Sequence, residues 1–197
     1  ELVGRLDPER GALSMLIKIV LGVAAAVVLV VGVLSVIVAM QPSEFHIERS
    51  VTIAAPAPAV FAQVNDFHNW EAWSPWAKLD PAAKNSFEGA PAGKGAALSW
   101  AGNSKVGEGR MTIVESRPDE LVRIKLEFLK PFEATNTAEF TFKPQGERTA
   151  VTWSMYGHNN FIGKAVGLSV NMDKALGAEF EKGLAGMKSA AEASAKR

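Results

Sequence analysis

The chain has 197 residues with equal numbers of basic and acidic side chains, 21 of each, so its formal net charge is zero. It has neither a basic excess nor a run of alternating basic and aromatic residues, which argues against a nucleic-acid-binding protein. The absence of cysteine excludes disulfides, thiol catalysis, iron–sulfur clusters and cysteine-ligated zinc.

The first predicted element is a membrane-spanning helix over residues 15–40, MLIKIVLGVAAAVVLVVGVLSVIVAM. Lys18 is its only charge, and the uncharged run that follows is long enough, at about 1.5 Å per residue, to cross a hydrocarbon layer about 30 Å thick. A cleaved signal peptide is the alternative, although its apolar region normally has about 7–15 residues and ends in small side chains. A buried core helix fits less well, because the segment is apolar on every side. The sequence therefore predicts an uncleaved signal anchor.

The charges around this helix predict its orientation. Arg5, Arg10 and Lys18 precede the uncharged run, whereas Arg49 is the only cation close behind it. Positive residues near a span favour the cytoplasmic side. We therefore expect a single-pass protein with its N-terminus in the cytoplasm and its C-terminal domain outside, which in a bacterium is the periplasm.

Short segments flank the predicted span. Residues 1–14 have no apolar periodicity, and Met15 followed by an apolar run is typical of a natural start. We therefore interpret residues 1–14 as an N-terminal extension, a tag or a misassigned start. Residues 41–43 form a minimal linker, residues 44–190 a folded domain and residues 191–197 a tail.

The folded domain opens with a strand and a short helix. Apolar and polar side chains alternate through FHIERSVTI as in a half-buried strand, with Arg49 the exception on the apolar face. The prolines of APAPAVFAQV suit the first turn of a helix. Val60, Phe61 and Val64 then recur at helical spacing, so a short helix is expected directly after the strand.

Beyond Pro81 the pattern is that of an antiparallel sheet. Alternation is strict in VRIKLEF and recurs in TNTAEFTFK and TAVTWSMY. The segments GAPAGKG, AGNSKVGEG, RPDE and PQGE are rich in turn-forming residues and separate the strands. Alternating strands joined by short turns predict a sheet with one covered and one solvated face.

An amphipathic helix of about twenty residues is predicted from about Asn171, because apolar residues recur there every three or four positions. They are Met172, Leu176, Phe180, Leu184, Met187 and Ala191. Gly177, Gly183 and Gly186 each cost such a helix roughly 0.5–1 kcal/mol relative to alanine, so packing must hold it. The glycines either let the helix lie close to the sheet or leave space beneath it.

The predicted order of elements resembles the START-like, polyketide cyclase/dehydrase (SRPBCC) superfamily over residues 44 to about 190. The segments that carry the resemblance are APAPAVF, WEAWSPW and FEKGLAGMK. The resemblance implies an α+β helix-grip fold, in which a curved antiparallel sheet surrounds a long C-terminal helix. The superfamily holds lipid carriers, cyclases, hormone receptors and chaperone activators, so the resemblance indicates a fold rather than one activity.

The resemblance places NDFHNWEAWSPW, residues 65–76, beside the mouth of a cavity between the sheet and the final helix. Its tryptophans either brace the short helix against the sheet or line that cavity, and one side chain can do both. Residues 156–170 are interpreted as a gate to the pocket or as a lead-in to the final helix. The predicted ligand-binding residues, each of which faces either an apolar pocket or a closed core, are Trp73, Trp76, Trp100, Phe128, Phe140, Trp153 and Met155.

The sequence contains no complete catalytic or metal-binding motif. It has no HExxH, no histidine pair with metal spacing and no nucleophile elbow, so no catalytic residue, metal or cofactor is predicted. Asp66, His68 and Glu71 are interpreted as a solvated helix end, with acid–base groups at the mouth as the alternative. Arg49 is interpreted as half of a buried ion pair, with contact to a ligand carboxylate or phosphate as the alternative.

The leading hypothesis is a non-catalytic, membrane-anchored binding module whose apolar cavity holds a lipid-like or aromatic small molecule. The alternative is an accessory or assembly subunit of a membrane complex, in which small residues such as Gly22 and Gly32 pack against another transmembrane helix. A cyclase- or hydrolase-type enzyme is the third possibility. The expected partners are a hydrophobic small molecule or lipid, the membrane and another membrane protein, but no nucleic acid.

Overall fold

The computed structural model describes residues 8–195, and the chain divides into two units between Gln41 and Pro42. The first unit holds one helix, α1 (Pro8–Ala39). Its apolar part, Met15–Ala39, has a mean hydropathy of 3.0 and is by length and composition a candidate membrane span. The helix begins at Pro8, within the range assigned to the N-terminal extension, and residues 1–7 of that range lie outside the described residues.

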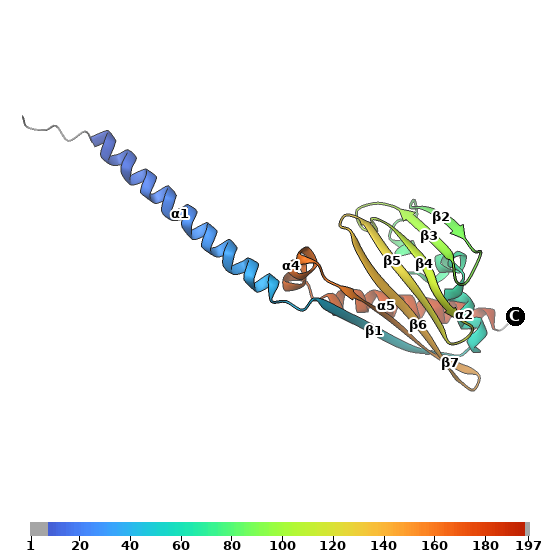
Figure 1. The fold of residues 1–197 in the computed structure, drawn as a ribbon. Coiled ribbons are helices and arrows are strands. Elements are labelled where there is room, and N and C mark those ends of the chain that lie inside the picture. The colour runs from blue at the N-terminus through green and yellow to red at the C-terminus, as the bar shows by residue number, and fades with distance from the viewer. Residues whose placement is uncertain (1–7, 196–197) are drawn as a thin grey trace, which may run out of the picture. The chain divides into compact units, whose positions relative to one another are not determined.

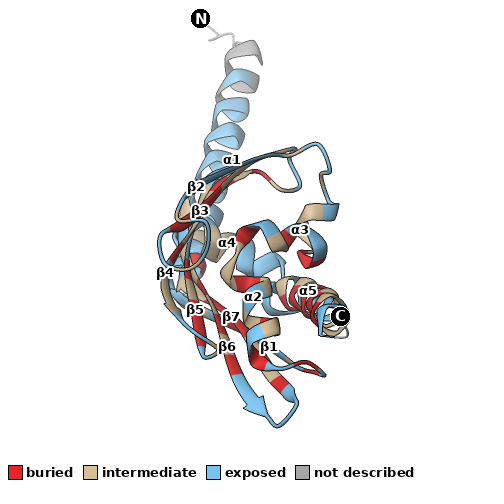
Figure 2. Cartoon of the chain, turned by 90° about the vertical axis from the view of Figure 1, so that its right-hand side faces the viewer, coloured by how far each residue is buried: buried red, intermediate tan, exposed pale blue. Residues whose placement is uncertain are grey.

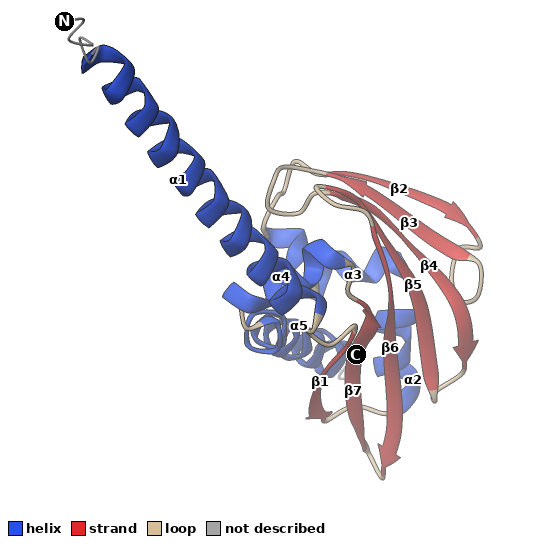
Figure 3. Cartoon of the chain, turned by 60° about the vertical axis from the view of Figure 1, so that its left-hand side comes forward, coloured by secondary structure: helices blue, strands red, loops and turns tan. Residues whose placement is uncertain are grey.

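The second unit is built on a curved, seven-stranded antiparallel sheet with the order β1-β7-β6-β5-β4-β3-β2 (Figures 1 and 3). Every strand except β1 pairs with its neighbour along the chain, and β1 pairs with β7 at the end of the meander. The strands are β1 (Glu44–Ile53), β2 (Lys84–Gly89), β3 (Ala96–Ala101), β4 (Glu108–Arg117), β5 (Leu121–Lys130), β6 (Ala134–Gln145) and β7 (Arg148–His158). The alternating segments and the four predicted turns are therefore confirmed.

One face of the sheet is covered by helices. The long helix α5 (Met172–Ser194) contacts β1 and the two short helices α2 (Ala57–Asn65) and α3 (Trp70–Trp73). The remaining elements are α4 (Phe161–Ser169) and two 3-10 turns, η1 (Phe67–Asn69) and η2 (Trp76–Lys78). The α+β helix-grip fold is thus confirmed. Helix α5 also continues through residues 191–194, which the sequence analysis assigned to the tail.

The core lies between the sheet and α5, as the buried residues in Figure 2 show. Strand alternation sends Ile47, Ile53, Phe140 and Val151 to this side, and all four are buried. The residues that alternate with them, such as Glu48, Ser50 and Thr52 in β1, face away from α5. The two-residue period of the sequence therefore specifies which face of the sheet is covered.

Candidate functional site

The tryptophan-rich segment folds back on the helix that precedes it. Helix α2 ends at Asn65, and the carboxylate of Asp66 accepts a hydrogen bond from the backbone N–H of His68 as η1 begins. The indole Nε1 of Trp70 donates to the carbonyl of Val64 over 3.0 Å. That of Trp73 donates to the carbonyl of Gln63 over 2.9 Å. These two bonds satisfy two of the four C-terminal carbonyls of α2, so Trp70 and Trp73 brace that helix.

Trp153 is the centre of an aromatic cluster between the sheet and α5. Its ring is stacked on Phe180 of α5, with centroids 4.2 Å apart and planes at 5°. The ring is also stacked on Phe140 of β6, with centroids 4.8 Å apart and planes at 28°. Trp73 and Trp76 present edges to it, each with a centroid separation of 5.7 Å. The cluster therefore joins two strands, the tryptophan segment and the final helix.

The predicted ligand-binding residues fall into two groups. Trp73, Phe140, Trp153 and Met155 are buried in the core, and Trp76 is the half-buried member of the aromatic cluster. The second group is a half-buried pair from β3 and β5, Trp100 and Phe128, whose rings meet edge to face at 5.9 Å.

The Trp100–Phe128 pair depends on a glycine. Gly109 of β4 pairs with Trp100 of β3 on one side and with Phe128 of β5 on the other. A Cβ at Gly109 would overlap Cζ2 of Trp100. Trp100 also donates through Nε1 to the carbonyl of Val106 over 3.0 Å. The absence of a side chain at Gly109 therefore lets two aromatic rings meet across a strand.

Sequence reasoning missed a polar atom in the aromatic cluster. The indole Nε1 of Trp153, a residue that is 3% exposed, has no hydrogen-bond partner among the described residues. Most buried polar groups in native proteins are paired, and leaving one unpaired costs about 1–3 kcal/mol. Trp70, Trp73 and Trp100 all donate to carbonyls, whereas the buried Nε1 of Trp153 has no such acceptor. A ligand with a hydrogen-bond acceptor would satisfy it.

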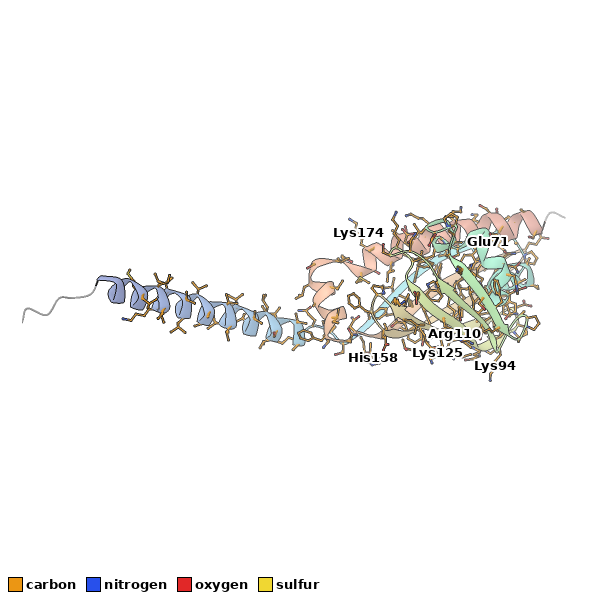
Figure 4. The ribbon with its side chains drawn as sticks, turned by 90° about the horizontal axis from the view of Figure 1, so that it is seen from above. Glu71, Lys94, Arg110, Lys125, His158 and Lys174 are labelled. Atoms are coloured by element: carbon orange, nitrogen blue, oxygen red, sulfur yellow. The ribbon has the colours of Figure 1, made fainter. Side chains whose placement is uncertain are left out.

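A shallow groove of about 640 Å³ lies on the other face of the sheet, near the end of β7. Strand alternation places most of its lining side chains, such as Lys125 and His158, opposite to α5, and Figure 4 shows these two on the side of the sheet away from that helix. The lining residues are Glu44, Phe45, His46, Lys125, Thr135, Asn136, Thr137, Tyr156, Gly157 and His158. The groove combines residues from four strands, and it was not predicted from the sequence.

The helix-grip architecture agrees with a family comparison. Residues 44–192 match the model of the family described as "Polyketide cyclase / dehydrase and lipid transport". The chain belongs to this family. The resemblance to the SRPBCC superfamily is therefore confirmed, whereas a search of curated proteins found no significant match.

Several solved structures share the fold at low sequence identity. Protein CV1439 from Chromobacterium violaceum is 13% identical, with a TM-score of 0.55 and coverage of 77% of this chain and 99% of that one. A Thermobifida fusca protein solved by NMR is 21% identical, with a TM-score of 0.56 and coverage of 73% and 90%. The di-domain ARO/CYC protein StfQ of the steffimycin biosynthetic pathway is 14% identical, with a TM-score of 0.56 and coverage of 79% and 53%. At these identities the likeness concerns the fold alone.

Two of the three titratable residues that the sequence analysis placed beside a cavity mouth, Asp66 and His68, form a local pair. His68 Nδ1 lies 2.8 Å from Asp66 Oδ1, and the imidazole stacks on Phe87 at 4.1 Å. Glu71 is exposed. Among residues 8–195, no three His, Cys, Asp or Glu side chains are placed to hold a metal ion. This arrangement is that of a solvated helix end.

Arg49, the charged residue on the apolar face of β1, forms ion pairs with α5. Its Nε donates to Glu181 Oε1 over 3.0 Å, and its Nη1 donates to Asp173 Oδ1 over 3.1 Å. Of the two interpretations, the structure supports the ion pair, which joins β1 to the helix, but the pair is not buried, since the side chains of Asp173 and Glu181 are 62% and 66% exposed. The hydrogen bond from Arg49 holds the pKa of Asp173 below its ordinary value, and the bond to Asp173 raises the pKa of Arg49.

These shifts predict how the stability of the domain depends on pH. Because the pKa of Asp173 is lower in the folded state than in the unfolded chain, its carboxylate stabilises the domain above the unfolded pKa of about 4, and this contribution is lost as the pH falls through the folded pKa. The free energy of unfolding of wild type should therefore exceed that of Asp173→Asn at neutral pH, and the two should converge in acid. The difference should disappear in an Arg49→Gln background. A gap that persists unchanged in acid or in that background would contradict the assignment, and urea titrations at several pH values measure it.

Proposed function

We propose that this protein is a non-catalytic, membrane-anchored binding module that holds a lipid-like or aromatic small molecule against the aromatic cluster. The unpartnered Nε1 of Trp153 carries the proposal, because an acceptor on the ligand would replace the missing hydrogen bond. The family description, which includes lipid transport, supports a ligand of this class. The candidate span Met15–Ala39 supports the anchor.

The geometry of the cluster limits the ligand that would fit. Stacked and edge-on rings from Phe140, Phe180 and Trp76 surround Trp153, so the body of the ligand must be apolar. One acceptor, such as a carbonyl, ester or hydroxyl oxygen, would meet the indole N–H. Trp76 is the accessible member of the cluster and lies in a 3-10 turn, so entry would proceed by displacement of its ring.

Native mass spectrometry of the second unit, residues 42–197, is the first experiment. This unit has its own core, so a ligand bound at the aromatic cluster should remain with it. We expect copurifying molecules with an apolar body and at least one oxygen acceptor. A preparation that carries no such molecule, and takes none up from extracted membrane lipid, would contradict the proposal.

A matched pair of variants locates the contact. Trp153→Phe and Trp73→Phe shrink an indole by the same amount, but only Trp73 donates to a protein carbonyl. We expect Trp153→Phe to weaken binding of the copurified ligand about 3- to 10-fold, which is the worth of one neutral hydrogen bond. Trp73→Phe should instead lower the free energy of unfolding, because the carbonyl of Gln63 loses its partner. Equal effects of the two variants on affinity would place the ligand elsewhere.

A further inference from the structure

Helix α4 presents an unusual surface. None of its residues is buried, although most of them are apolar. Phe161, Ile162, Val166 and Leu168 are each between 43% and 55% exposed, and Val170 directly after the helix is 43% exposed. Such a concentration of exposed apolar side chains, five within residues 161–170, is typical of an interaction site rather than of ordinary protein surface.

A second exposed apolar segment lies at the same end of the sheet. Leu129, the second-last residue of β5, is 55% exposed, and Phe132 in the turn between β5 and β6 is 57% exposed. Asn136 near the start of β6 pairs with Gly157 near the end of β7, so this turn and α4 both project beyond that end (Figures 1 and 3). We call α4 with Val170, Leu129 and Phe132 the apolar end of the domain.

The chain itself ties the apolar end to the anchor. The backbone N–H of Asn159, two residues before α4, donates to the carbonyl of Ser43 over 2.7 Å. Ser43 follows Ala39, the last residue of α1, by four residues, which span at most roughly 14 Å when extended. If α1 crosses a bilayer, the start of α4 must therefore lie close to the surface from which the chain emerges.

We infer that the apolar end docks on this bilayer surface, with the side chains of α4 and of the β5–β6 turn buried among headgroups and the upper acyl chains. The inference rests on the proposed anchoring. The short tether makes the contact intramolecular, so even a weak surface preference keeps it populated. Helix α4 has one charge, Lys164, so the contact is apolar in character and should persist at high salt.

Site-specific fluorescence in the full-length chain tests this inference. The protein has no cysteine, so single cysteines label without background. We would attach an environment-sensitive fluorophore at Val166→Cys and Phe132→Cys, with Glu147→Cys in the β6–β7 turn at the opposite end of the sheet as the matched control. The probe is a phosphatidylcholine vesicle with and without a spin-labelled phosphatidylcholine that quenches nearby fluorophores.

We expect blue-shifted emission at positions 166 and 132, with roughly threefold more lipid quenching than at position 147, at low and high salt alike. A blue shift at 166 without lipid quenching would overturn the inference, since a second copy or another protein would then cover α4. Emission at 166 matching that at 147 would overturn it as well. A fourth label at Leu29→Cys separates the two proposals: quenching at 29 without quenching at 166 removes only the docking, whereas no quenching at 29 removes the anchoring and the docking together.

Discussion

Replacing Gly183 by leucine is expected to lower the free energy of unfolding of the domain by about 2–3 kcal/mol, as overpacking of a well-filled core does. A Cβ at this position would lie 2.7 Å from Cζ3 of Trp153 and 3.1 Å from Cδ of Pro75. Trp153 cannot withdraw easily, because its ring is stacked on both Phe140 and Phe180. Helix α5 would have to move away from the sheet, which would loosen the aromatic cluster.

The control for this variant is Gly167→Leu in α4, where an added Cβ meets nothing within 4 Å. Leucine favours helix more than glycine does, so this substitution should be neutral or slightly stabilising. Thermal unfolding of residues 42–197 followed by circular dichroism compares the two, and the Gly183 variant should melt several degrees lower, at roughly 2–4 °C per kcal/mol. If both variants melted with wild type, α5 would not lie as close to the sheet as described.

The glycines of α5 show which features of the fold could be predicted from the sequence and which could not. Their spacing indicated a helix held by packing, but close approach and empty space beneath the helix remained alternatives. The choice depends on what lies across the interface, namely the guanidinium of Arg49 at Gly177, the ring of Trp153 at Gly183 and the backbone of Trp73 at Gly186. These partners are distant in sequence, so the periodicity of one helix cannot reveal them. The structure supports close approach.

The candidate site was predictable only in outline. Strand alternation correctly placed Phe140, Trp153 and Met155 on the covered face, and the spacing of the tryptophans indicated a local concentration of rings. Whether a tryptophan braces the short helix or lines a cavity depends on its hydrogen bonds. Those of Trp70 and Trp73 follow from the path of the chain after α2. The unpartnered Nε1 of Trp153 and the groove on the opposite face could not be predicted from the sequence. The first depends on which acceptors lie near the indole, and the second on the register of four strands.

Replacing Leu29 and Val30 together by arginine is expected to release the protein from membranes. Both positions lie in the uncharged part of α1, where an arginine costs about 2.5–3.5 kcal/mol on insertion scales, so two cost about 5–7 kcal/mol. The fraction that resists carbonate extraction from membranes should fall from nearly all to a small remainder. The matched control, Leu29→Ile with Val30→Leu, keeps the apolar character and should stay in the membrane.

The mass of the mature protein separates an anchor from a cleaved signal peptide, which the same apolar run would otherwise satisfy. An anchor predicts that wild type keeps Met15–Ala39 and sediments with membranes. A signal peptide predicts a soluble product that has lost the segment, and this result would remove both the anchoring and the reason for α4 to meet a bilayer. The two arginines are informative in the anchored case because they change only the cost of crossing the hydrocarbon layer. Leu29 and Val30 lie outside the second unit, so the full-length variant should bind its ligand as wild type does.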